Sequence, residues 1–210
     1  MLDYEGRGLL LSCFQIMFDT VESEYLKAKE VYSLLIEIKQ ISLAQQVADG
    51  YAKSFLLAAA SKFESEIKKL VLDWIKNRTG NCPNVEAFIQ ISILDRGYAR
   101  LFSWNDGGKG VNAFLKLFGD EFCARAKAQI KDDVNVESGA CAFIEIGQQR
   151  NKLVHNDFSS FNVIFTIDES YKKYQNAIIF ITFLRSCLIH NDDGDKISHV
   201  APQPSPPPSP

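Results

Sequence analysis

The residues best suited to catalysis lie in one short stretch, Arg150-Asn151-Lys152-Leu153-Val154-His155. Arginine donates paired hydrogen bonds to phosphate oxygens, and histidine can give or take a proton near neutral pH. RNA cleavage without a metal needs such groups: a base for the 2′-hydroxyl, an acid for the leaving 5′-oxygen, and positive charge at the phosphate. One histidine cannot readily be base and acid in one step. Two copies of the stretch facing one cleft make better chemistry, which predicts a homodimer.

The stretch ends a segment, residues 136–154, in which apolar residues recur at helical spacing. At about 100° per residue, Arg150 falls at the centre of an apolar face. The other members of this face are Phe143, Ile146, Gly147, Leu153 and Val154. The opposite face is expected to carry Glu145, Gln148, Gln149 and Lys152. A charge is costly to bury without a partner, so either Arg150 meets an anion or this face is less buried than its pattern indicates.

Arg150 and His155 cannot share one face of an unbroken helix, because five residues separate them by about 140° around the axis. Asn151 and His155, four residues apart, lie instead along one edge. The arginine and the histidine could converge if the helix ends near Val154, or if two copies of the chain meet across a two-fold axis. The alternative for His155 is a helix-end residue that interacts with the helix dipole.

Long helices should position this segment. Six of the seven prolines follow residue 201, and the rest of the chain contains only Pro83, which favours long uninterrupted helices. Apolar residues recur at helical spacing over residues 9–40 and 54–78, and we expect Gly50 to mark a break or a kink before the second helix. Shorter helices are expected over residues 85–94, 111–118 and 120–131, and an apolar last helix over 170–190.

Three further patterns carry weaker signals. The glycines and Lys109 in residues 104–110 could cradle a phosphate, but the P-loop spacing and a preceding apolar strand are missing, which favours a plain connector. The alternation in residues 161–166 suggests a short extended piece. Arg185 stands five residues before His190, in a helix too apolar to offer RNA an open face, and we interpret that spacing as coincidence.

The spacing of arginine and histidine resembles the Arg-x4-6-His motif of HEPN domains, small helical domains common in RNA-cleaving toxins and antiphage proteins. The resemblance extends to Phe63-Glu64 in the middle of the second long helix, to the two long helices, to residues 109–119 and to the apolar last helix. It covers about residues 20–190. The resemblance implies an all-α, HEPN-like helical bundle with long antiparallel helices and additional short helices.

The resemblance also implies roles for single residues. Catalytic HEPN ribonucleases are similar in being dimers whose two motifs line a shared groove and cleave RNA without metal. By this likeness Arg150 would hold the scissile phosphate, His155 would transfer protons, and Asn151 would orient the histidine or the phosphate. Glu64 would help to orient the arginine. The alternative for Glu64 is a salt bridge with Lys68, four residues further on.

Composition limits the classes of function and compartment. The net charge of −3 gives no overall basic signature, so RNA binding would need a local patch. Candidates are Lys62, Lys68, Lys69, Lys76 and Arg78, and beyond them Arg96, Arg100, Arg125, Lys127 and Lys131; the alternative is that these are solvated helix faces. Five widely spaced cysteines without a C-x-x-C pair indicate reduced thiols and argue against a zinc site.

We therefore expect a single HEPN-like domain over residues 1–195 and a flexible Pro/Ser-rich tail over residues 196–210. The predicted function is a cytoplasmic, metal-independent endoribonuclease of a toxin or antiphage system, with no cofactor and no membrane contact. Its expected partners are RNA (tRNA or mRNA), a second copy of the chain, and an antitoxin or sensor protein. The alternative is a non-catalytic HEPN-like module that binds RNA, a nucleotide or a partner protein.

Overall fold

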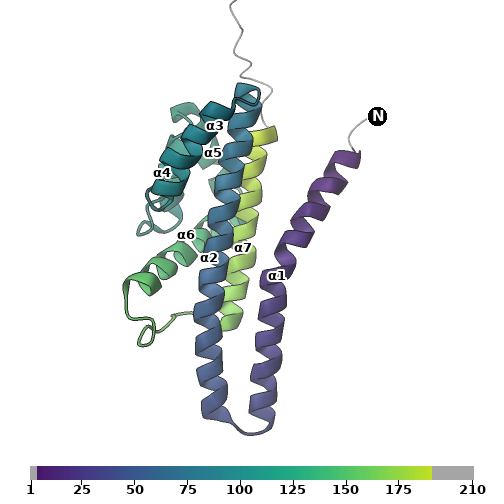
Figure 1. The fold of residues 1–210 in the computed structure, drawn as a ribbon, viewed down its shortest axis with the longest axis vertical. Helices are drawn as coiled ribbons and strands as arrows, with labels where there is room; N and C mark the ends of the chain where they lie inside the picture. The colour runs from purple at the N-terminus through teal and green to yellow at the C-terminus, as the bar shows by residue number, and fades with distance from the viewer. Residues whose placement is uncertain (1–3, 191–210) are drawn as a thin grey trace, which may run out of the picture.

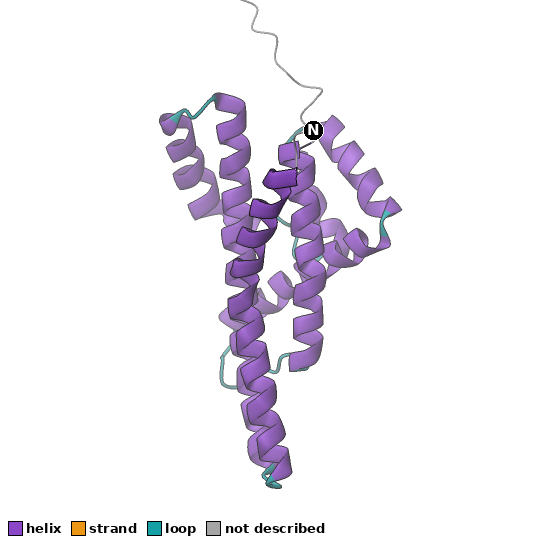
Figure 2. Ribbon diagram, turned by 90° about the vertical axis from the view of Figure 1, so that its right-hand side faces the viewer, coloured by secondary structure: helices purple, strands orange, loops and turns teal. Residues whose placement is uncertain are grey.

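The computed structural model describes residues 4–190, with side chains described over residues 20–189, and it is helical throughout (Figures 1 and 2). Helices α1 (Tyr4–Glu37) and α2 (Ile41–Thr79) form an antiparallel hairpin, and α7 (Ile167–Arg185) runs beside α2 (Figure 1). Helix α6 (Val134–His155) packs against both α2 and α7. No strand occurs among the described residues. The predicted all-α fold with long antiparallel helices is confirmed.

Shorter helices fill the sequence between α2 and α6. They are α3 (Pro83–Ile89), a π-helical turn (Gln90–Asp95), two 3-10 turns (Tyr98–Arg100 and Gly107–Val111), α4 (Asn112–Lys116) and α5 (Asp120–Asp132). Pro83 stands in the first turn of α3, where its missing N–H removes no helical hydrogen bond. Gly80 ends α2 in the left-handed conformation (φ 65°), and its N–H donates to the carbonyl oxygen of Lys76.

One local expectation is wrong. The break expected at Gly50 is absent, because α2 continues through this residue from Ile41. A glycine inside a helix costs only about 1 kcal/mol relative to alanine, and the buried side chains of Ala44, Ala52 and Phe55 anchor the helix on both sides of it. Residues 161–166, where the sequence suggests a short extended piece, lie in a loop and form no strand. A strand needs a partner for its backbone hydrogen bonds, and the described part of the chain offers none.

Aromatic rings from three helices meet at the centre of the bundle. Phe63 of α2 stacks on Tyr174 of α7, with ring centroids 5.4 Å apart, and contacts Phe143 of α6 at 5.6 Å. All three rings are at most 2% exposed. Aromatic pairs of this kind contribute about 0.5–1.5 kcal/mol each beyond their buried area. Because Phe63 precedes Glu64 and Phe143 lies about two helical turns before Arg150, this cluster fixes where both of the polar residues lie.

A group of charges around the buried carboxylate of Glu66 joins α2 to the end of α7. The guanidinium of Arg185 lies 3.5 Å from Glu66 and 3.4 Å from Asp73, and Lys62 lies 3.5 Å from Glu66. Glu66 is only 3% exposed, so its charge depends on these partners. Arg185 is therefore directed at carboxylates of α2 within the domain, whereas the side chain of His190 lies outside those described.

Candidate functional site

Helix α6 carries three of the predicted site residues on its last two turns. The helix begins at a cap, the Asp133 carboxylate, which accepts a hydrogen bond from the N–H of Asn135 (2.9 Å). It then continues without interruption to His155. The end expected near Val154 lies at His155, one residue further on, so the histidine is still helical and the chain does not turn it back towards Arg150.

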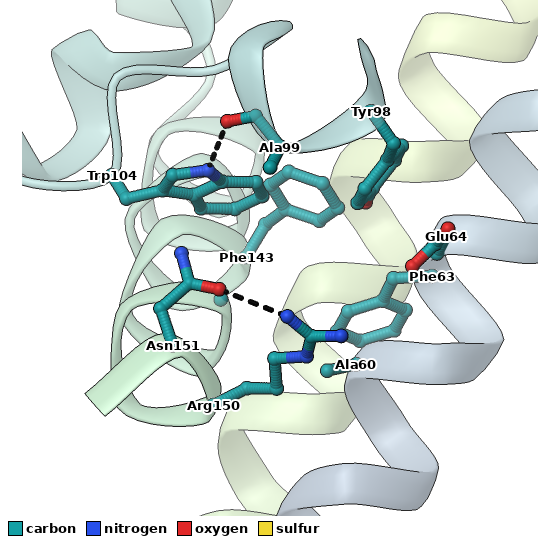
Figure 3. A pocket seen from close by; sticks show the side chains of 10 residues that line it. Ala60, Phe63, Glu64, Tyr98, Ala99, Trp104, Phe143, Arg150 and Asn151 are labelled. Atoms are coloured by element: carbon teal, nitrogen blue, oxygen red, sulfur yellow. Dashed lines mark hydrogen bonds between the residues drawn. The ribbon is translucent and has the colours of Figure 1, made fainter. Parts of the chain in front are cut away.

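Arg150 lines a small pocket between α6, α2 and the segment that includes Tyr98 and Trp104 (Figure 3). The pocket measures about 30 Å³, room for one water molecule. Its lining residues are Ala60, Phe63, Glu64, Tyr98, Ala99, Trp104, Phe143, Gly147, Arg150 and Asn151. Burial, together with the negative charge of Glu64, raises the pKa of Tyr98, so its hydroxyl is a neutral member of this wall. The structure thus brings together Arg150, Asn151 and Glu64.

The guanidinium of Arg150 is held by an amide. Its Nη1 donates to Oδ1 of Asn151 at 3.2 Å, and the arginine side chain is half-buried (Figure 3). Among the described residues no carboxylate forms a salt bridge with it. Glu64 instead pairs with Lys68 at 2.9 Å, and this hydrogen bond raises the pKa of Lys68. The salt bridge considered for Glu64 is present, and most N–H donors of Arg150 remain available to an incoming anion.

Trp104 forms a wall of the pocket that the sequence did not reveal. Its Nε1 donates to the carbonyl oxygen of Ala99 at 2.8 Å (Figure 3). The ring lies so close to α6 that a Cβ added at Gly147 would be 2.0 Å from its Cζ3 atom. The one available signal was Gly147 itself, because a glycine inside an otherwise regular helix often permits a close approach.

Two of the three glycines in residues 104–110 are also explained by packing. A Cβ at Gly108 would lie 2.6 Å from Sγ of Cys141 on α6, and one at Gly110 would lie 2.2 Å from the carbonyl oxygen of Ser103. The segment forms a 3-10 turn that packs against α6. These close approaches account for Gly108 and Gly110, and Gly107 has a positive φ of 54°, so the three glycines need no phosphate cradle.

Comparison with known protein families identifies the family to which this helical domain belongs. The profile of the RiboL-PSP-HEPN family matches residues 23–190. The chain belongs to this HEPN family. No curated protein and no solved structure matches it. The resemblance drawn from the Arg-Asn-x3-His stretch and the long helices is thereby confirmed at the level of the family, and the matched residues include all those that line the Arg150 pocket.

His155 of this HEPN domain lies outside the Arg150 pocket. It is the last residue of α6 and is exposed, and none of the described groups forms a hydrogen bond with it. Asn156 follows it and donates from Nδ2 to the carbonyl oxygen of Lys152 at 2.6 Å. Since α6 is unbroken, His155 points about 140° around the helix axis away from Arg150. One chain therefore gathers Arg150 and Asn151 but not His155.

The loop after the motif is fastened to α2 by Lys53, which the sequence analysis missed. Lys53 is only 8% exposed, and its Nζ donates to the carbonyl oxygens of Phe158 (2.8 Å) and Ser159 (3.4 Å). The ammonium also lies 5.2 Å from the centre of the Phe158 ring. A signal was present: Lys53 falls within about 20° of Ala60 around α2, so it is a charge on a largely apolar stripe, as Arg150 is.

The two faces of α6 differ from the expectation at two positions. Gln149, expected on the polar face, is only 2% exposed, whereas Val154, expected on the apolar face, is 47% exposed. Helices α2, α5 and α7 and the 3-10 turn all pack on α6, so its buried surface extends further around the axis than one stripe. The last turn projects beyond the bundle (Figure 1), which leaves Val154 uncovered.

Searches for other kinds of site cover the described residues. None of their His, Cys, Asp and Glu side chains form a group of three or more that could hold a metal ion. No helix among them combines the length and the apolar character needed to cross a bilayer. Cys82, Cys123, Cys141 and Cys187 are free thiols.

Proposed function

We propose that this HEPN domain is a metal-independent endoribonuclease whose active site is completed by two copies of the chain. The observation that carries the proposal is the Arg150 guanidinium, which is half-buried and held by the Asn151 amide, with no salt bridge to a described carboxylate. A cation placed in this way is stabilised when an anion arrives, and phosphate is the anion that its paired donors fit. Membership of the HEPN family, whose domains are often ribonucleases, supports the same function.

In the proposed reaction the RNA 2′-oxygen attacks the adjacent phosphorus while the bond from phosphorus to the 5′-oxygen breaks. The products are a 2′,3′-cyclic phosphate and a 5′-hydroxyl. His155 of one copy accepts the 2′-hydroxyl proton, and His155 of the other copy protonates the leaving oxygen. Arg150 donates to the non-bridging oxygens, on which negative charge increases in the transition state. Asn151 holds the guanidinium in place for this contact.

The first test is cleavage of total RNA and tRNA by the purified protein in EDTA. Arg150→Ala should lose about 10²–10³ in rate, as removal of one transition-state donor does, and His155→Ala about 10²–10⁴. Lys152→Ala is the matched control, because this residue is exposed on the same turn and has no assigned role. Cleavage that needs a divalent metal, or that persists in folded Arg150→Ala and His155→Ala proteins, would contradict the proposal.

A mixing experiment tests whether the site needs two histidines. Wild-type and His155→Ala subunits are combined in equal amounts and allowed to exchange. If both histidines of a dimer are required, about a quarter of the activity of the same total amount of wild-type protein should remain, because only that fraction of dimers is fully wild type under random assortment. If each chain acts alone, about half should remain. The second result would exclude the composite site while leaving the nuclease intact.

One observation favours a second candidate, a non-catalytic RNA-binding module. His155 lies outside the pocket that holds Arg150, so in one chain the two residues serve different surfaces. A folded dimer that binds RNA through Arg150 but cleaves neither total RNA nor tRNA would support this candidate.

A further inference from the structure

A second concave site lies on α6, towards its N-terminus from the Arg150 pocket. It is a groove of about 610 Å³ between α5, α6 and the 3-10 turn at residues 107–111. We call it the lysine groove. Its lining residues are Asp106, Gly108, Lys109, Val111, Asn112, Lys127, Ile130, Lys131, Glu137, Ala140 and Cys141. At twenty times the volume of the Arg150 pocket, it can admit part of a large ligand.

Three lysines give this groove its positive charge. Lys127 and Lys131 are four residues apart on α5, so their side chains lie next to each other, and Lys109 reaches the groove from the 3-10 turn. None of the three forms an ion pair or hydrogen bond with another described side chain. Like charges four residues apart on a helix repel each other by a few tenths of a kcal/mol, a cost that a bound anion removes.

Three lysines of α2 are different. Lys62, Lys68 and Lys76 each lie within 3.6 Å of a carboxylate, those of Glu66, Glu64 and Glu86 respectively. These lysines are therefore largely neutralised by their neighbours. Of the two basic patches expected from the sequence, the one beyond α2 supplies Lys127 and Lys131 to the groove in an uncompensated form.

Two carboxylates, Asp106 and Glu137, also line the groove, and neither forms a salt bridge with its lysines in the described structure. The charged lining is three lysines against two acids, so the groove is positive overall but weakly so. Such a lining suits a ligand with spaced single charges. The ammonium group of lysine is a compact charge that lacks the planar, paired donors of arginine. Lysines therefore neutralise phosphates whatever the base sequence is.

The groove and the pocket follow each other along α6. Ala140 lines the groove and Arg150 lines the pocket, and the ten residues that separate them correspond to about 80° around the axis and about 15 Å along it. The segment from Trp104 to Lys109 contributes to both sites. A strand that runs along α6 and turns partly around it would meet the lysines and Arg150 in turn.

We infer that the lysine groove binds the phosphodiester backbone of single-stranded RNA whose scissile phosphate lies at Arg150. This inference rests on the proposed nuclease function for its direction, since that function places the strand at Arg150. The lysines neutralise successive phosphates on one side of the cut, independently of base sequence. The groove thereby fixes which part of a bound strand reaches the pocket.

The test measures binding without cleavage. A fluorescent 2′-O-methyl RNA oligonucleotide is used, because it lacks the 2′-hydroxyl that cleavage requires. Lys127→Gln/Lys131→Gln should lower the slope of log K against log salt by about 1.4, which is about 0.7 for each single-strand phosphate contact, and weaken binding about 25-fold at about 0.1 M salt. Lys39→Gln/Lys172→Gln removes the same charge from exposed positions outside the groove and should change binding little.

A substitution that makes the groove more positive gives a further test in the same binding experiment. Glu137→Gln removes a negative charge from the groove and should tighten binding of the same oligonucleotide, most clearly at low salt. Failure of the double lysine variant to weaken binding, or equal weakening by the control pair, would overturn the inference. Displacement of the oligonucleotide by micromolar pyrophosphate, with no dependence on oligonucleotide length, would also overturn it by identifying a compact polyphosphate site.

The groove assignment and the nuclease proposal can be refuted independently of each other. If the protein cleaves no RNA but the groove variants still weaken oligonucleotide binding as expected, the binding site stands and the catalytic proposal falls. If Arg150→Ala and His155→Ala abolish cleavage while the groove variants bind normally, the nuclease stands and the groove assignment falls.

Discussion

Replacing Gly147 with alanine should destabilise this HEPN domain, although alanine is the better helix former. Gly147 lies in α6 one turn before Arg150, with the Trp104 ring against it. An added Cβ would lie 2.0 Å from Cζ3, 2.4 Å from Cε3 and 2.9 Å from Cη2 of that ring. Real Cβ contacts are not that short, so the ring has to move. The indole is held from its other side by the hydrogen bond from Nε1 to the Ala99 carbonyl oxygen.

The opposing contributions can be compared. Alanine gains about 1 kcal/mol over glycine in a helix interior. Forcing a methyl group into a packed site costs about 1–3 kcal/mol, and contact with three ring atoms places Gly147→Ala at the upper end. Loss of the Trp104 hydrogen bond adds about 1 kcal/mol. The net loss is about 3 kcal/mol, which for a domain of this size lowers the melting temperature by roughly 6–12 °C.

Gly50→Ala is the matched control, because Gly50 is also inside a helix but a Cβ there would meet nothing within 4 Å. It should gain about 1 kcal/mol and raise the melting temperature by about 2–4 °C. Urea unfolding followed by circular dichroism and tryptophan fluorescence measures both variants. Equal stabilisation by the two alanines would refute the reasoning. So would a Gly147→Ala cost that survives when Trp104 is also replaced by alanine, because the proposed clash is then gone.

Three other predictions concern contacts outside the pocket. The Asp168 carboxylate accepts hydrogen bonds that lower its pKa in the folded protein. The stabilisation that it gives is present above its ordinary pKa of about 4 and is lost as the pH falls through the lower pKa of the folded state. In urea titrations between about pH 7 and pH 3, the Asp168→Asn protein should therefore lose less stability than the wild type. Lys53→Met leaves two loop carbonyls without their donor, should cost about 1–3 kcal/mol, and should speed amide exchange in residues 157–160, where unchanged exchange would contradict it. Glu66→Gln should cost about 1–3 kcal/mol in the same unfolding assay, because it removes the charge facing Arg185; a neutral effect would show that the pair is dispensable.

Most of the helices could be predicted because their signals are local. Apolar spacing over residues 136–154 and 120–131 anticipates α6 (Val134–His155) and α5 (Asp120–Asp132) closely. The predicted break at Gly50 was wrong because a contribution that is not local decides the structure there. Glycine lowers helix stability by a small local amount, while packing along both halves of α2 acts through residues distant in sequence, and the second contribution is larger.

The candidate site was predictable only in part. Arg150 was recognisable because it is a charge at the centre of an apolar face, and that criterion needs no knowledge of the neighbouring helices. The position of Trp104 in the pocket wall could not be recognised, because helical periodicity does not indicate which loop covers a given face of a helix. Burial of Gln149 likewise depends on how many elements surround α6, and the uncovering of Val154 depends on how far the helix projects beyond them.

The unbroken course of α6 constrains the function more strongly than the motif does. It places Arg150 in a pocket with room for about one water molecule, and His155 in solvent on another side of the same helix. Among the described side chains of one chain no histidine lies beside Arg150, and in the proposed mechanism His155 of a second chain reaches the phosphate that Arg150 holds. The lysine groove, by contrast, is complete within one chain. A substitution that dissociates the dimer without touching the motif should then abolish cleavage while oligonucleotide binding in the groove persists, and cleavage by a proven monomer would refute the two-chain site.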